Sequence, residues 1–183
     1  KRFIVPAVVF ILGMCALIGV IYVVGESQEQ QNRTNARLNA MTYAERIYGE
    51  LMEGIGVTDT LKQVVISGDG NINKFYDIAA NMMDDSIQSI QIAPNGVVTE
   101  IYPEEGNVSG KIDLINDSDR GEISRYARDN DTVIMQGTFE LKQGGYGIAV
   151  RNPVYLKNEN GQKSFWGFTI VILKVPEIFS DSV

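Results

Sequence analysis

The sequence predicts an α+β fold, in which an N-terminal transmembrane helix continues into a long helix and is followed by a domain with a five-stranded antiparallel sheet. Three observations predict this fold. Residues 3–24 carry no charged side chain, residues 41–55 repeat apolar residues at helical spacing, and residues 86–175 change to short alternating segments separated by turns. Because a helix has 3.6 residues per turn and a strand has a period of two, this change marks the passage from helix to sheet.

The uncharged segment is long enough to cross a membrane. Its 22 residues make roughly 33 Å of helix, and a hydrocarbon core is about 30 Å thick. Lys1 and Arg2 precede it, and cations favour the cytoplasmic side. We therefore expect residues 1–25 to be an anchor in the inner (plasma) membrane with a cytoplasmic N-terminus, and residues 26–183 to be extracytoplasmic. A cleaved signal peptide and a packed soluble helix are the alternatives, but no small-residue cleavage pattern follows the segment.

Composition argues against several classes of function. The part after the anchor has 23 acidic against 14 basic residues, a net charge of −9, which disfavours nucleic acid as a partner. The chain has no histidine, and its single cysteine, Cys15, lies in the anchor. The outer part therefore lacks the commonest general base and the commonest zinc ligands. We expect no catalytic residue, no metal site and no cofactor.

Residues 26–57 are expected to form a juxtamembrane long helix that ends near Gly54 and Gly56. Alternating steps of three and four residues give it one apolar stripe: Met41, Ala44, Tyr48, Leu51 and Ile55. Two alternatives stay open for this stripe. It packs on the chain's own domain, or it pairs with the same stripe of a second chain in a parallel homodimer.

Residues 58–183 are expected to form one domain that begins with short helices. Asp59 or Thr60 is a candidate cap for a helix over 61–67, and Asn71 for a second one. Helical spacing in the second one joins four apolar residues: Ile72, Phe75, Ala79 and Met82. A third short helix is expected over 122–128, with Ser118 as its cap.

Five strands are predicted in the same domain. Residues 86–93 and 97–102 form a hairpin around Pro94-Asn95-Gly96. Three further strands are expected over 132–141, 146–156 and 164–175. Pro153 predicts that the second of these three is interrupted or lies at an edge, because proline lacks the N–H that a ladder needs. The helices are expected on one face of the sheet.

Several short motifs after residue 86 occur in a specific order. They are Ile92-Ala93-Pro94-Asn95-Gly96, Ile101-Tyr102-Pro103-Glu104-Glu105, Gly110-Lys111-Ile112-Asp113-Leu114, Phe139-Glu140-Leu141, Arg151-Asn152-Pro153-Val154-Tyr155 and Phe165-Trp166-Gly167-Phe168. Together these motifs, over about residues 86–170, resemble the CHASE domain, the cyclase- and histidine-kinase-associated extracellular sensory domain. Residues 26–85 are similar to it only in their helical character.

The resemblance implies a PAS-like ligand-binding domain that controls a cytoplasmic output: a diguanylate cyclase, a cyclic-di-GMP phosphodiesterase or a histidine kinase. Plant members of the family bind cytokinins, which are adenine derivatives, and their main polar contact is an aspartate before the short helix. Asp113 resembles this aspartate, and Met135 resembles an apolar residue that lines the same pocket. The expected ligand is a small molecule, either adenine-like or a small carboxylate.

Other candidate ligand contacts are judged from their chemistry. Three aromatic residues and one aliphatic residue would contact a planar ligand or fill the core: Tyr102, Phe139, Phe168 and Ile92. Arg151, in an otherwise apolar strand, would bind a carboxylate or phosphate, or else pair with Asp113 or Glu100. Asp113 would anchor the ligand, or else cap its own loop.

These features predict an extracytoplasmic ligand-sensing domain of a transmembrane signalling receptor. A ligand would shift the domain between two states, and the long helix would carry the shift to the membrane. The alternative is a single-span, membrane-anchored protein-interaction module without a small-molecule ligand.

Overall fold

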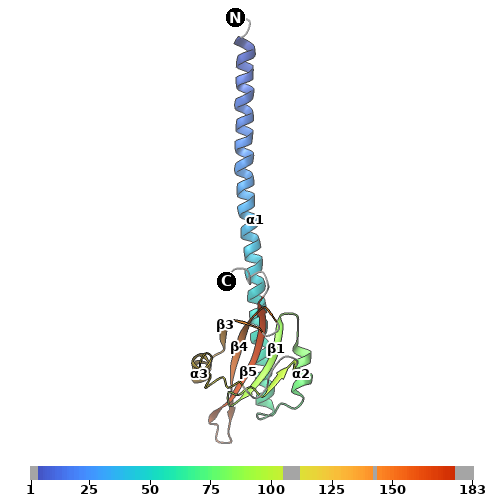
Figure 1. The fold of residues 1–183 in the computed structure, drawn as a ribbon, viewed down its shortest axis with the longest axis vertical. Coiled ribbons are helices and arrows are strands. Elements are labelled where there is room, and N and C mark those ends of the chain that lie inside the picture. Colours follow the sequence, from blue (N-terminus) through green and yellow to red (C-terminus); the bar gives the residue numbers. More distant parts are fainter. Residues whose placement is uncertain (1–3, 105–111, 142–143, 176–183) are drawn as a thin grey trace. The chain divides into compact units, whose positions relative to one another are not determined.

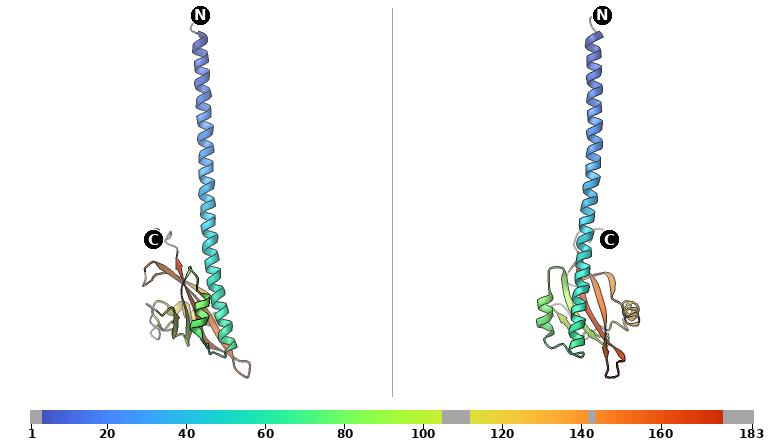
Figure 2. Two further views of the ribbon diagram at one scale, coloured as in Figure 1. Left: turned by 90° about the vertical axis from the view of Figure 1, so that its right-hand side faces the viewer. Right: turned by 180° about the vertical axis from the view of Figure 1, so that it is seen from behind.

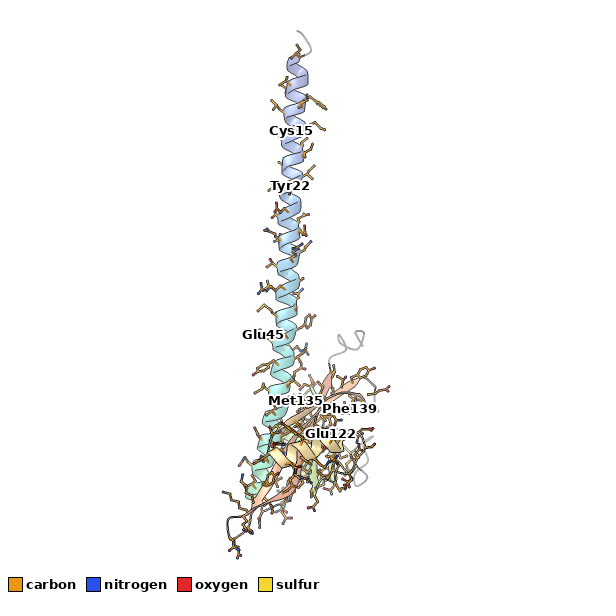
Figure 3. The ribbon with its side chains drawn as sticks, turned by 90° about the vertical axis from the view of Figure 1, so that its left-hand side faces the viewer. Cys15, Tyr22, Glu45, Glu122, Met135 and Phe139 are labelled. Carbon is orange, nitrogen blue, oxygen red and sulfur yellow. The ribbon has the colours of Figure 1, made fainter. Side chains whose placement is uncertain are left out.

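The computed structural model describes residues 4–104, 112–141 and 144–175 and divides into two compact units, Lys1–Tyr48 and Gly49–Val183. The first unit consists of the earlier part of helix α1, which runs from Ile4 to Ser67. In the part of the chain that the structure describes, α1 is the one helix long and apolar enough to cross a membrane, judged by length and composition. The apolar side chains of residues 8–24 are exposed, and Cys15 and Tyr22 project from the helix in Figure 3.

Helix α1 does not end at Gly54 or Gly56, so the predicted break before residue 61 was wrong. At Gly54 a Cβ atom would lie 2.8 Å from a methyl carbon of Leu173, which shows that this glycine permits close packing inside a continuous helix. The helix ends instead at Ser67. Gly70, with a φ of 86°, donates its N–H to the carbonyl oxygen of Val65 at 2.9 Å and closes the last turn.

The predicted five-stranded antiparallel sheet is confirmed, with the strand order β2-β1-β5-β4-β3 (Figure 1). Its strands are β1 (Ile87–Pro94), β2 (Glu100–Tyr102), β3 (Ile134–Glu140), β4 (Tyr146–Lys157) and β5 (Lys163–Val175). Strand β2 is shorter than expected because the residues before it pair elsewhere. Val98 donates its N–H to the carbonyl of Ile112 at 3.0 Å, and Leu114 donates to Gly96 at 2.8 Å.

Strand β4 is one uninterrupted strand and is not an edge strand along its whole length, but it has a free edge at Pro153, as the proline suggested. It lies between β5 and β3. Its pairing with β3 extends only to Arg151, whereas its pairing with β5 continues past Pro153. The proline therefore lies where β4 has one neighbour, and its missing N–H removes no bond to β3.

Two short helices begin at other residues than expected. Helix α2 spans Phe75–Met82 and follows Lys74, which has a φ of 66°, so Asn71 does not cap it. Helix α3 spans Gly121–Asn130. Ahead of α3, the Asp117 carboxylate accepts the N–H groups of Asp119 and Arg120 at 2.9 Å each. Asp117 therefore takes the role that the sequence suggested for Ser118.

The sheet is covered on both faces, so the expectation of helices on one face was wrong. The last turns of α1 and helix α2 pack on one face around Leu61, Phe75 and Val171, as Figure 2 shows. Helix α3 and the segment before it pack on the other face around Ala127 and Phe168. Both faces need a cover because the central strand β5 is apolar on both sides.

Candidate ligand-binding site

A cavity of about 330 Å³ lies on the α3 face of the sheet. Two rows of directly paired residues form its floor, and paired residues project to the same face of a sheet. The first row is Ser89, Ile172, Ala149 and Gln136, and the second row is Ile101, Gln91, Ile170 and Arg151. All eight residues line the cavity. The site is therefore built across all five strands.

The walls of the cavity come from two segments. Ile112 and Leu114, ahead of α3, form one apolar wall, and Phe139 and Leu141, at the end of β3, form another. Charged side chains from both segments also line the cavity: Asp119, Arg120 and Glu140. The cavity thus combines an apolar enclosure with a few convergent polar groups, as small-molecule sites usually do.

Arg151 is the most unusual polar group of the cavity. Its side chain is buried, and the residue is only 3% exposed. One guanidinium nitrogen, Nη2, donates to Oε1 of Gln136 at 2.5 Å. Nε and Nη1 are buried and have no hydrogen-bond partner among residues 4–104, 112–141 and 144–175. An unpaired buried N–H is unfavourable, so these two groups point to a missing acceptor.

The Arg151 guanidinium stays charged at neutral pH. Burial lowers its pKa to about 10, repulsion from Arg120 acts in the same direction, and attraction to Asp117 opposes both. Arg120 is itself 41% exposed and lies 3.9 Å from the Asp117 carboxylate. The floor of the cavity therefore holds a desolvated cation whose charge is only partly balanced.

The structure brings together two of the residues predicted for the site, Phe139 and Arg151. Phe168 is fully buried in the core on the same face and does not line the cavity. Ile92 and Tyr102 pack on the opposite face, with α1 and α2. Met135, labelled in Figure 3, pairs with Val150, is 36% exposed and does not line the cavity. None of these four residues lines this cavity, and their ligand roles stay predictions.

Asp113 does not line the cavity, although its neighbours Ile112 and Leu114 do. Its Oδ1 accepts the N–H groups of Ile115 and Asn116 at 3.0 Å each, and Oδ2 accepts the Asn116 side-chain amide at 2.8 Å. The Asn116 side chain first, and then the backbone N–H groups, hold the pKa of Asp113 below its usual value. This geometry favours the alternative in which Asp113 caps its own loop.

Replacing Asp113 by Ala should lower the free energy of unfolding by about 1–2 kcal/mol, because the loop loses its capping carboxylate. The pKa of Asp113 is lower in the folded state than its ordinary value of 3.8, which applies to the unfolded chain. The stabilisation by the carboxylate is therefore fully present above pH 3.8 and is lost as the pH falls through the pKa of the folded state. The difference from the parent, measured by urea unfolding, should therefore be present at pH 7 and shrink below about pH 4.

The matched control for this prediction is Asn116→Ala, which removes the side-chain bond but leaves both backbone N–H bonds to Asp113. It should destabilise the domain less than Asp113→Ala. Loss of ligand binding in Asp113→Ala, with unchanged stability, would instead restore Asp113 as the ligand anchor.

Three polar residues of the floor were missed by the sequence analysis: Ser89, Gln91 and Gln136. Ser89 and Gln91 are 2% and 8% exposed, and Gln91 Nε2 donates to Ser89 Oγ at 2.9 Å. They alternate with Ile90 and Ile92, so the pattern was that of a strand with a solvent face. The signal available in the sequence was the run of uncharged polar residues, since lysine and glutamate are more usual on a solvated face.

A second, more open cavity of about 490 Å³ lies beside the β4–β5 hairpin. Several of its polar side chains have hydrogen-bond partners. Lys62 donates to Asn152 at 3.1 Å, Lys163 donates to Asp131 at 3.4 Å, and the Tyr155 hydroxyl donates to the carbonyl of Arg128. Among the described residues, no buried polar side-chain atom of this lining lacks a partner, whereas two nitrogens of Arg151 do, so we regard the smaller cavity as the candidate site. Within the described ranges, no three acidic or cysteine side chains gather where they would hold a metal ion.

The family of the chain follows from its similarity to known proteins. The CHASE domain model matches residues 28–183, so the chain belongs to the CHASE domain family. The match begins well before the motifs and includes the part of α1 that follows the apolar segment. CHASE domains are extracellular sensory domains, and this describes the matched residues. No curated protein matches the chain.

A solved structure shares the fold. It is described as an extracellular ligand binding receptor from Desulfohalobium retbaense DSM5692. The similarity has a TM-score of 0.56 with 13% sequence identity and covers 75% of this chain. The chain spans 24% of the length of that receptor. At this identity the similarity shows a common fold only. The ligand of this chain has to be inferred from its own residues.

Proposed function

We propose that this chain is the ligand-binding part of a membrane-anchored signalling receptor, with residues 1–25 in the inner membrane, the N-terminus in the cytoplasm and the PAS-like sensor domain outside. The chain itself acts as a sensor and not as an enzyme. Its output is a cytoplasmic diguanylate cyclase, phosphodiesterase or histidine kinase of the parent protein. The observation that carries the proposal is the cavity on the sheet, in which two guanidinium nitrogens of buried Arg151 have no hydrogen-bond partner among the described residues.

A route from the cavity to α1 supports a signalling role. Arg151 lines the cavity, and the next residue, Asn152, faces the last turns of α1. Asn152 is 1% exposed; its Nδ2 donates to Asp59 at 2.6 Å, and its Oδ1 accepts from Lys62 at 3.1 Å. A ligand that moves β4 at Arg151 would therefore also change the contacts of Asn152 with α1.

The proposed receptor is a homodimer that uses the exposed part of the apolar stripe on α1. Leu51 and Ile55 pack against the chain's own sheet, so they are not available to a second chain. Met41 and Tyr48 are 50% and 65% exposed. Disulfide crosslinking of a Tyr48→Cys variant in membranes tests this contact.

Filling the cavity tests the proposed function without assuming the chemistry of the ligand. Ala149 is 1% exposed and lies in the cavity floor. Ala149→Leu should occupy part of about 330 Å³ and abolish the thermal shift that a small-molecule library gives with the full chain. Because the substitution goes into a cavity, the melting temperature without ligand should change by only a few degrees.

The matched control is Ala36→Leu, the same substitution at an exposed position of α1, which should keep every ligand response. If no small molecule stabilises the parent chain, and a protein partner binds the parent and Ala149→Leu equally well, the chain is an interaction module instead. In that case the cavity has no role in recognition.

A further inference from the structure

Arg151 is the one ionisable group of the cavity, among the described residues, that is almost completely buried. Three other charged residues line the cavity: Asp119 and Glu140 are exposed, and the Arg120 side chain is 41% exposed. Water and salt screen exposed charges, whereas a desolvated charge interacts strongly with a ligand. The buried guanidinium therefore determines which charge on a ligand the cavity favours, and that charge is negative.

Among the described residues, no carboxylate is hydrogen-bonded to the Arg151 cation, and a buried cation without such a counter-ion is unfavourable. The Gln136 amide oxygen is a neutral acceptor and accepts from only one of the three guanidinium nitrogens. A carboxylate against the guanidinium would provide the missing charge and an acceptor for Nη1 or for Nε, which lie on different edges of the group. Charge-assisted bonds between arginine and carboxylate are among the strongest hydrogen bonds in proteins.

The remainder of the cavity is suited to an apolar group. Its aliphatic lining comes from floor and walls: Ile101, Ile112, Leu114, Leu141, Ile170 and Ile172. The volume of about 330 Å³ is near the lower end of ligand pockets, which run from about 300 to 1,000 Å³. A bare inorganic anion would pair with Arg151 but leave this apolar surface uncovered. A neutral molecule would cover the surface and leave the cation without a counter-ion.

We propose that the ligand is a small organic acid, whose carboxylate accepts charge-assisted hydrogen bonds from the Arg151 guanidinium and whose apolar body lies against the isoleucine and leucine side chains. This inference rests on the proposed function of the cavity and adds the chemical class of its ligand. It also assigns Arg151 as the residue that selects an anion.

The test compares acids with their amides on the full chain in detergent micelles, by calorimetry and thermal shift. The probes are phenylacetate with phenylacetamide, isovalerate with isovaleramide, leucine, adenine and inorganic phosphate. An amide keeps the shape and loses the charge, so each acid should bind roughly 10- to 100-fold more tightly than its amide. Stronger binding of adenine, phosphate or an amide than of either acid overturns the proposal. Leucine adds an ammonium group to the isobutyl group and carboxylate of isovalerate. Stronger binding of leucine than of isovalerate would therefore overturn a simple acid as the ligand and indicate an amino acid.

The variant Arg151→Met removes the charge and keeps much of the side-chain volume. It should abolish the acid response and raise the melting temperature of the unliganded chain, because an uncompensated buried charge has gone. Arg37→Met, at an exposed position of α1, should change neither property. A lower melting temperature together with retained acid binding would show that Arg151 is a structural residue and would overturn the proposal.

These measurements distinguish a wrong ligand class from a wrong function of the cavity. If acids and amides bind the parent equally and Ala149→Leu abolishes both, the cavity is a ligand site and only the anion class fails. If no probe and no library compound binds the parent, the proposed function fails as well. The acid and amide comparison uses the parent chain, so it remains decisive even where Arg151→Met does not fold.

Discussion

Replacing Gly167 by Ala is expected to lower the free energy of unfolding by about 3 kcal/mol or more, since it combines backbone strain with overpacking. Gly167 has a φ of 155°, and a Cβ there would lie 2.2 Å from the carbonyl oxygen of Ala93 and 2.8 Å from Cα of Pro94. Both are backbone atoms of β1, so no side-chain rotation relieves the clash. Asn95 donates its N–H to the carbonyl of Trp166 at 2.7 Å and holds the two strands at this distance.

The measurement is urea unfolding followed by circular dichroism and by the fluorescence of Trp166, the single tryptophan of the chain. The matched control is Gly137→Ala on β3, where a Cβ would meet no atom within 4 Å. Gly137→Ala should change stability by less than about 0.5 kcal/mol, or increase it slightly through the unfolded state. Equal effects of the two substitutions would show that β5 can move away from β1, and the argument from close approach would be wrong.

Features of the fold that depend on local sequence patterns could be predicted, whereas those that depend on contacts between distant residues could not. The apolar segment of α1 and the strands follow from periodicity, which is a local property. Gly54 was interpreted as the end of a helix because glycine usually breaks one, yet its role depends on Leu173, which is far away in the sequence. Pro153 was interpreted as an edge signal, and only the length of β3 decides how many neighbours β4 has at that residue.

The candidate site shows the same limit. Arg151 was identified because a charge is unusual in an apolar strand, and the structure places it in the cavity. Ile92 was a candidate ligand contact, but it packs on the opposite face of the sheet. Because β1 is buried on both faces, the alternation of its residues does not tell which face holds a ligand. Asp113 was chosen by family resemblance, whereas its neighbours Ile112 and Leu114 occupy the inward positions.

Asn152→Ala should have the second large effect, a loss of about 2–4 kcal/mol in the free energy of unfolding. The variant removes two part-buried hydrogen bonds to ionisable partners, Asp59 and Lys62; bonds to charged groups contribute about 1.5–3 kcal/mol when buried and less when solvent reaches them. A second contact between the sheet and α1 remains, because Thr169 donates its hydroxyl to the carbonyl of Thr58 at 2.9 Å. The domain should therefore stay folded with a weakened link to α1.

The functional consequence of Asn152→Ala concerns coupling more than binding. Arg151 and the cavity lining are unchanged, so the variant should bind an acid with nearly the affinity of the parent. Ligand-dependent protection from hydrogen exchange over residues 58–62 of α1 should be present in the parent and absent in the variant. The matched control Asn81→Ala removes one exposed bond to the Asp77 carbonyl and should preserve that protection. If Asn152→Ala is destabilised but still shows the full ligand effect on α1, the signal reaches the helix by another path, and Asn152 serves stability alone.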